Sequence, residues 1–303
     1  MWFLFAALVP IVLAFTAWGP GNHLEFEARV HRRRRELLPA RIADLIEAER
    51  PAWQYGHIAA DIINFKAFGG HYNHCHRWTI VDSMLALARS PAEEAFVLGY
   101  LSHLAADTIA HNHFVPYHLA RYARGHKLGH LYWEANADRF VAEDRWHAIT
   151  VLKWDHRLAR LDELVNSTVP RKALSMGTNK LIFNHVLLSS ERKLWRRNIE
   201  RFHPRKQLRL DGKFLDMFQR AAVERVALAL RRDGRAKLAH VDTNGKQAQE
   251  LALTLRSAIV ERFGAGEARE AALEKAASVF LEGMQSPPPK PDGGRKAVWT
   301  RAK

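Results

Sequence analysis

One stretch of the 303-residue chain, from Ser90 to Asp138, constrains the fold more than any other because it is crowded with potential metal ligands. A packed helical core does not tolerate so many imidazole and carboxylate groups unless they are paired or bind a cation. We expect the stretch to form two helices that bring these side chains together. The potential ligands are His103, Asp107, His111, His113, His130, Glu134 and Asp138.

The first of these two helices has a clear start. Ser90 suits the N-cap, Pro91 the first helical position and Glu93 the third, which together form a capping box. We expect the helix to end before Pro116, because the residue that precedes a proline is disfavoured in the helical conformation. Residues spaced four apart lie about one turn above each other. One face of the helix should therefore carry His103, Asp107 and His111.

The second helix repeats this arrangement between residues 129 and 144. Here too the ligand types are spaced four residues apart and share one face, at His130, Glu134 and Asp138. Ten of the seventeen histidines in the chain lie between His57 and His130. No stretch shows the alternation typical of strands. The sequence therefore predicts an all-α, multi-helix bundle with a metal-binding cleft between its central helices.

A carboxylate and a histidine-rich loop upstream add further candidate ligands. Asp61 lies in an otherwise apolar stretch, where an unpaired carboxylate is costly and needs a cation or hydrogen-bond donors nearby. Gly69 and Gly70 then indicate a loop with three histidines in six residues, which is either a metal-binding loop or a surface run. Cys75 is an alternative ligand, although hydrolytic zinc sites more often use histidine and carboxylate. The three histidines are His71, His74 and His76.

The two ends of the chain differ from its centre. Residues 1–17 carry no charged side chain and are too short for a comfortable membrane span, which predicts a signal peptide or, if uncleaved, an N-terminal anchor. Cleavage after Ala17 would free the α-amine of Trp18, which could bind a metal beside His23. Residues 286–303 are rich in Pro, Gly and Lys and are predicted to be a disordered basic tail. Residues 18–285 form the helical domain between them.

Charge and cysteine content narrow the choice of partner. The formal net charge of +14 favours an anionic partner, such as a phospholipid headgroup or nucleic acid, although a solvated basic surface explains it equally well. The run from Arg32 to Arg35 is more typical of a solvated face than of a site. Cys75 is the only cysteine, so no intrachain disulfide can form. No protein partner is predicted.

In their order and approximate spacing these residues resemble the zinc-dependent phospholipase C and fungal single-strand nuclease superfamily. The absence of disulfides resembles its bacterial branch, and the second half of the chain matches only in being helical. The resemblance covers residues 18–138. It rests on six features, namely Trp18 five residues before His23, the isolated Asp61, the loop with His71 to His76, the HxxxD motif at His103, another histidine shortly after it, and the HxxxE motif at His130.

The resemblance implies an all-α domain that holds up to three zinc ions in a cleft. One ion would be bound by Asp61, one of His74 or His76, His103 and Asp107. Asp107 would also bridge to a second ion, whose other ligands would be His111, His130 and Glu134. His113 is an alternative to His111, and His71 an alternative in the loop. The third ion would be bound by the amine and carbonyl of Trp18 with His23, and Asp138 would support these ligands from one turn beyond Glu134.

The resemblance also implies phosphoester hydrolysis. Two zinc ions about 3.5–4 Å apart lower the pKa of a shared water and hold the hydroxide in line with phosphorus. Asp61 and Asp107 would tune the metal charge and take the proton. We predict an exported (periplasmic or secreted) hydrolase that acts on a phospholipid or another phosphodiester, at a membrane surface if the substrate is a lipid. The alternatives are a non-enzymatic, metal-stabilised domain, and a nuclease or 3′-nucleotidase that stacks bases on Trp53, Phe68, Tyr72 or Trp78.

Overall fold

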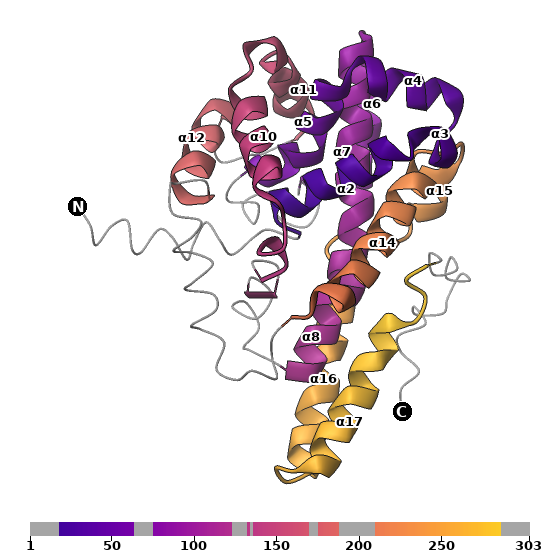
Figure 1. The fold of residues 1–303 in the computed structure, drawn as a ribbon, viewed down its shortest axis with the longest axis vertical. Coiled ribbons are helices and arrows are strands. Elements are labelled where there is room, and N and C mark those ends of the chain that lie inside the picture. Colours follow the sequence, from indigo (N-terminus) through magenta and orange to yellow (C-terminus); the bar gives the residue numbers. More distant parts are fainter. Residues whose placement is uncertain are drawn as a thin grey trace, which may run out of the picture.

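The computed structural model describes residues 18–63, 75–122, 132–133, 136–169, 175–187 and 210–285, so the predicted leader and tail lie outside it. Every regular element in this part of the chain is helical, which confirms the all-α fold class (Figure 1). The α-helices are α2 (Pro20–Arg32), α3 (Arg34–Leu37), α4 (Ala40–Ala48), α5 (Arg50–Ile62), α6 (Trp78–Leu87), α7 (Pro91–Ile109), α8 (Val115–Tyr122), α10 (Glu143–Trp154), α11 (Leu161–Thr168), α12 (Met176–Leu187), α14 (Gly212–Ala229), α15 (Gly234–Leu238), α16 (Lys246–Arg262) and α17 (Glu267–Ser278). Shorter π or 3-10 segments are η3 (Ala110–Phe114), η4 (His156–Leu158) and η6 (Val279–Leu281).

Helix α7 forms the axis of the bundle (Figure 1). It begins with the predicted capping box: Ser90 Oγ accepts a hydrogen bond from the Glu93 N–H at 3.3 Å, and the Glu93 carboxylate accepts one from the Ser90 N–H at 2.9 Å. Every residue from Ala95 to Ile109 is buried, because α5 and α14 pack along the helix and α2 and α6 also contact it. Polar side chains on this helix therefore point into the protein whichever face they occupy.

Helices α5 and α7 approach each other closely at a pair of glycines. A Cβ atom added to Gly56 or to Gly99 would lie 2.1 Å from a backbone carbonyl oxygen of the opposite helix. A backbone atom within a helix cannot move aside as a flexible side chain can, so only glycine fits at these two positions. The contact lies about one turn before Asp61 on α5 and one turn before His103 on α7. It thus sets the distance between two candidate ligands from different helices.

Helix α7 ends at Ile109, before Pro116 as expected, but contrary to expectation the chain stays helical through the proline. The chain passes from α7 through the π-helical segment η3 into α8, and Val115 keeps helical dihedrals of φ −64° and ψ −49°. The Val115 N–H bonds to the Ala110 carbonyl, five residues back. This wider turn accommodates the proline ring, which in a regular α-helix would clash with the carbonyl four residues earlier. The π turn also carries His111 and His113.

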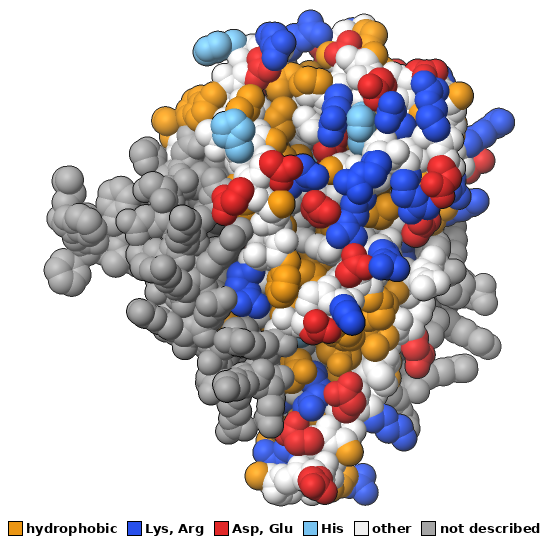
Figure 2. All heavy atoms as spheres, viewed as in Figure 1, with side chains coloured by type: hydrophobic (Ala, Val, Ile, Leu, Met, Phe, Trp, Pro, Cys, Tyr) orange, Lys and Arg blue, Asp and Glu red, His pale blue; other side chains and the backbone are white. Residues whose placement is uncertain are grey.

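The basic run at the end of α2 is a solvated, ion-paired face, as predicted. Figure 2 shows Lys and Arg side chains interspersed with Asp and Glu over this face of the molecule. Exposed pairs of this kind contribute little to stability, and they neutralise the run locally. The pairs are Arg33–Glu36 at 2.5 Å, Arg34–Glu47 at 2.7 Å and Arg35–Asp44 at 2.5 Å.

The C-terminal helices extend the bundle beyond the ligand region. Helices α16 and α17 lie side by side and both pack against α8, which continues the axis of α7 (Figure 1). Among the described residues, no helix combines the length and the apolar character needed to cross a membrane.

Candidate metal centre

Two imidazoles and two carboxylates converge where α5, α7 and the segment before α6 meet. The Nε2 atoms of His76 and His103 lie 2.9 Å apart. Each of these nitrogens is 3.2 Å from Oδ2 of Asp107 and 3.8 Å from Oδ1 of Asp61. All four side chains are buried. Residues up to 46 positions apart in the sequence are thus brought to one point by the close packing of α5 on α7.

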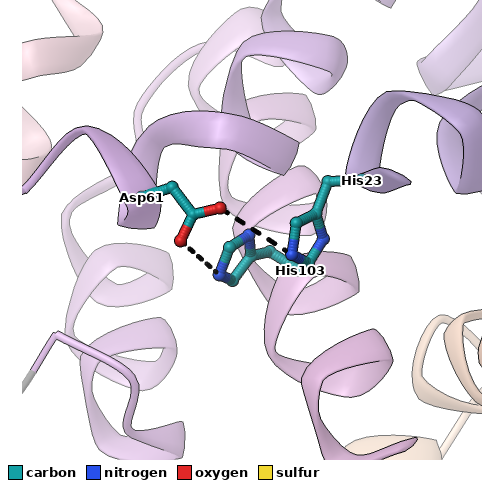
Figure 3. A group of neighbouring side chains, drawn as sticks. All are labelled: His23, Asp61 and His103. Carbon is teal, nitrogen blue, oxygen red and sulfur yellow. Dashed lines mark ion pairs between the residues drawn. The ribbon is translucent and has the colours of Figure 1, made fainter. Parts of the chain in front are cut away.

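A fifth ligand type, His23, reaches the same point from α2. Its Nε2 lies 3.3 Å from Oδ1 of Asp107 and 3.9 Å from Oδ2 of Asp61, and its ring stacks on that of His103 at 3.8 Å between centroids. Figure 3 shows His23 and His103 on the same side of the Asp61 carboxylate. The two oxygens of Asp107 therefore face different imidazoles, an arrangement suited to a carboxylate shared between two cations.

The donor set fits zinc. Histidine nitrogens and carboxylate oxygens bind Zn²⁺ at about 2.0–2.2 Å, and a tetrahedron of such bonds has edges of about 3.3 Å. The contacts among His76, His103 and Asp107 are 2.9–3.2 Å long. Among the described residues, both oxygens of Asp107 and both ring nitrogens of His23 are buried without a hydrogen bond of normal geometry. Such groups are costly in a protein interior unless a cation satisfies them.

The His103 ring is held in the tautomer that a metal requires. Its Nδ1 lies 2.9 Å from the carbonyl oxygen of His57. A carbonyl can only accept, so Nδ1 carries the hydrogen and the lone pair of Nε2 faces Asp107. Backbone carbonyls commonly orient metal-bound histidines in this way.

The electrostatics of the cluster favour a neutral His23 imidazole beside an ionised Asp107 carboxylate. Burial lowers the pKa of His23, and the neighbouring His103 lowers it further, against the opposing effect of Asp107. Burial alone would raise the pKa of Asp107, but His103, with close contacts from His23 and His76, holds it well below its usual range. Neutral imidazole and ionised carboxylate are the forms that bind metal.

Sequence reasoning missed His57, which lies one turn before Asp61 on α5. Its side chain is fully buried, and neither ring nitrogen has a hydrogen-bond partner in the described part of the chain. Burial holds its pKa well below the usual range, and the neighbouring imidazoles of His23 and His103 lower it further. The signal was available, because His57 and Asp61 repeat the HxxxD spacing of His103 and Asp107.

The second predicted ligand group is described only in part. His130 and Glu134 lie outside the described residues, as do His71 and His74, the other loop candidates for the first ion. His111 and His113 are both buried in η3. Nδ1 of His113 donates to the Phe280 carbonyl at 2.8 Å, and burial lowers the pKa of His113 to about 4. The assignment of His111, His130 and Glu134 to a metal stays a prediction.

Trp18 is anchored at the edge of the cluster by its side chain. The indole is fully buried, donates Nε1–H to the Ala106 carbonyl at 3.2 Å and stacks on Phe114 at 4.7 Å. These contacts fix the residue beside α7 close to Asp107. A metal ligand role for the Trp18 amine stays a prediction that depends on removal of residues 1–17.

Asp138 caps the helix that carries His23. Its Oδ1 accepts hydrogen bonds from the Asn22 backbone N–H at 3.3 Å and from the Asn22 side-chain amide at 2.5 Å. Asn22 lies in the first turn of α2, whose N-cap residue is Gly19 and offers no side chain. A Cβ at Gly19 would lie 1.8 Å from Asp138 Oδ2, so the distant carboxylate occupies the place of a local cap.

We expect Asp138→Asn to flatten the pH dependence of stability. Burial raises the pKa of Asp138 from 3.8 to about 7, against the opposing hydrogen bonds from Asn22. A raised folded pKa contributes stability that is complete below the unfolded pKa of 3.8 and is lost as the pH rises through about 7. Asparagine keeps the acceptor oxygen but does not ionise. In urea unfolding of the metal-free proteins, the stability of the variant relative to the wild type should therefore rise as the pH increases from 3.8 to about 7.

Asp138→Ala is the matched control, because it removes the acceptor as well as the charge. Its free energy of unfolding should be about 1–2 kcal/mol lower than that of the wild type at the acid end of the same pH series, because the helix cap is lost. If the free energy of unfolding of the wild type and of the Asn variant changed in parallel with pH, burial would not raise the pKa of Asp138 in the folded protein.

Comparison with known proteins agrees with this geometry. A family model described as zinc dependent phospholipase C matches residues 22–176, just over half of the 303-residue chain. The matched segment contains the five converging side chains, and no curated protein or solved structure matches the chain. The five side chains are His23, Asp61, His76, His103 and Asp107. This chain belongs to the zinc-dependent phospholipase C family.

Proposed function

We propose that this protein is an exported, zinc-dependent phosphoester hydrolase of the phospholipase C type, which cleaves the phosphodiester bond of a phospholipid between glycerol and phosphate. The observation that carries the proposal is the buried convergence of His76, His103, Asp107, Asp61 and His23 within a chain of this family. Export rests on the charge-free leader of residues 1–17.

In this proposal Asp61, His76, His103 and Asp107 would hold one zinc ion of up to three. Asp107 would also contribute to a second ion, with His111, His130 and Glu134. Trp18 and His23 would hold the third ion. Bound zinc supplies Lewis acidity and a hydroxide source near neutral pH.

The protein groups position the metal ligands and accept a proton. The His57 carbonyl orients His103, and the buried α5–α7 contact keeps bulk water away from the back of the cluster. Asp61 lies 3.8 Å from both His76 and His103. Its carboxylate is therefore placed at the edge of the donor set, where it can accept a proton from the attacking nucleophile.

A phospholipid fits the described residues better than a nucleic acid does. Single-strand nucleases need exposed aromatic rings on which bases stack. Of the four candidate rings, Phe68 and Tyr72 lie outside the described residues, and Trp53 and Trp78 are buried at 0% and 8% exposure. Neither tryptophan therefore presents a face to a base.

The test compares two substrates on the same zinc-loaded protein. We expect a short-chain phosphatidylcholine to release phosphocholine and diacylglycerol, with single-stranded DNA cleaved far more slowly. A chelator should abolish the reaction, and added zinc should restore it. Faster cleavage of DNA would assign the nuclease alternative, and purified protein without bound zinc by elemental analysis would contradict both enzymatic readings.

A further inference from the structure

The backbone that delivers His76 to the cluster is held on two sides. The Tyr100 hydroxyl donates to the Cys75 carbonyl at 2.8 Å, and the Thr243 hydroxyl donates to the His76 carbonyl. Trp78 Nε1–H donates to the Val241 carbonyl at 2.9 Å. These bonds fix the main chain, but they do not by themselves orient the His76 ring.

A thiol lies beside the His76 ring. Nε2 of His76 points at the donor set, and its other nitrogen, Nδ1, lies 3.2 Å from Sγ of Cys75. Sγ in turn lies 3.8 Å from the carbonyl oxygen of Ala60, the residue before Asp61. Cys75 is buried, with 2% of its surface exposed. For His76 the sulfur thus occupies the position that the His57 carbonyl occupies for His103.

We propose that Cys75 is a positioning residue for the metal centre. Its sulfur accepts the Nδ1–H of His76 while its S–H is directed at the Ala60 carbonyl, so that the Nε2 lone pair of His76 is presented to zinc. The sequence alone allowed Cys75 as a metal ligand. In this proposal it is instead the hydrogen-bond partner of the ligand His76. The inference rests on the proposed function only in requiring a metal at this cluster.

The competing explanation is packing, because a buried free cysteine behaves as a small apolar side chain. Two substitutions separate the explanations, because hydrogen bonding and packing predict opposite orders of zinc affinity for the two variants. Cys75→Val fills the space but cannot accept a hydrogen bond, whereas Cys75→Ser keeps an acceptor and a donor but packs less well. Loss of an outer hydrogen-bond partner of a metal ligand typically costs 10–100-fold in metal affinity.

The experiment measures zinc dissociation constants by chelator competition, and the absorption spectrum of the Co²⁺-loaded protein, for wild type and both variants. We expect Cys75→Val to lose affinity by about 10–100-fold with a changed Co²⁺ spectrum, and Cys75→Ser to recover most of both. The reverse order, with Val equal to wild type and Ser weakened, would overturn the proposal. Metal-free thermal stability, measured alongside, reports the packing effect separately.

A measurement on the wild type decides the matter even if Cys75→Val does not fold. Long-range ¹H–¹⁵N NMR of the zinc-loaded protein should show His76 protonated at Nδ1 with zinc on Nε2, and Cys75→Ser should shift that Nδ1 proton. A His76 with the opposite tautomer would overturn the proposal. Zinc binding without phospholipase activity would contradict the proposed function but leave the Cys75 inference standing, whereas a wild type that binds no zinc would overturn both.

Discussion

Asp107→Asn is expected to abolish hydrolysis and to lower the zinc content together. Oδ2 of Asp107 lies 3.2 Å from Nε2 of both His76 and His103, and Oδ1 lies 3.3 Å from Nε2 of His23. An amide offers one neutral oxygen in place of two charged ones, so it cannot be shared between two cations. We expect phosphatidylcholine hydrolysis to fall by at least about a thousandfold, because the chemistry that bound zinc supplies is lost.

Asp162→Asn is the matched control for this substitution. Asp162 accepts hydrogen bonds from the hydroxyl of Tyr55 and, at 2.6 Å, from Nζ of Lys180, away from the donor cluster. The control variant should lose stability but keep its zinc and its activity per folded molecule. Elemental analysis and an initial-rate assay on both variants make the comparison, and an Asp107→Asn protein that stays fully active would rule out the shared-ligand role.

The side chains that converge could be predicted from the sequence because ligand spacing within a helix is local information. The four-residue interval between His103 and Asp107 places them on one face, and the capping box fixes where that helix begins. His76 could be narrowed only to a loop of three histidines. The position of His76 depends on hydrogen bonds from Tyr100 and Thr243 to the backbone, which are contacts between distant parts of the chain.

What the sequence did not reveal depends on tertiary packing. Pro116 was expected to end a helix, but the π turn at η3 accommodates it within a buried continuous helix. Asp138 was expected to support ligands beyond Glu134, whereas its described contacts cap α2 through Asn22. In each case a local preference is overridden or completed by a contact that no local pattern encodes.

The close approach of α5 and α7 makes Gly99→Ala the most informative structural variant. The added Cβ would lie 2.1 Å from the Trp53 carbonyl oxygen and 2.9 Å from Gly56 Cα, both backbone atoms of α5. The helices must separate, which costs about 1–3 kcal/mol or more. Asp61 moves with α5, while His103 moves with α7. Since functional sites tolerate displacements of only about 0.5 Å, zinc affinity should fall as well.

Gly177→Ala provides the comparison, because it makes the same substitution in a helix position that no described residue approaches closely. The nearest described atom to a Cβ at Gly177 is Ser175 Oγ at 3.9 Å, and alanine is the better helix former by about 1 kcal/mol. The Gly177 variant should therefore match or exceed the wild type in urea unfolding and bind zinc equally. If Gly99→Ala also kept its stability and zinc affinity, Gly56 and Gly99 would not set the spacing of the ligand helices. A joint loss of stability and zinc at Gly99 alone would instead tie the metal centre to the α5–α7 contact.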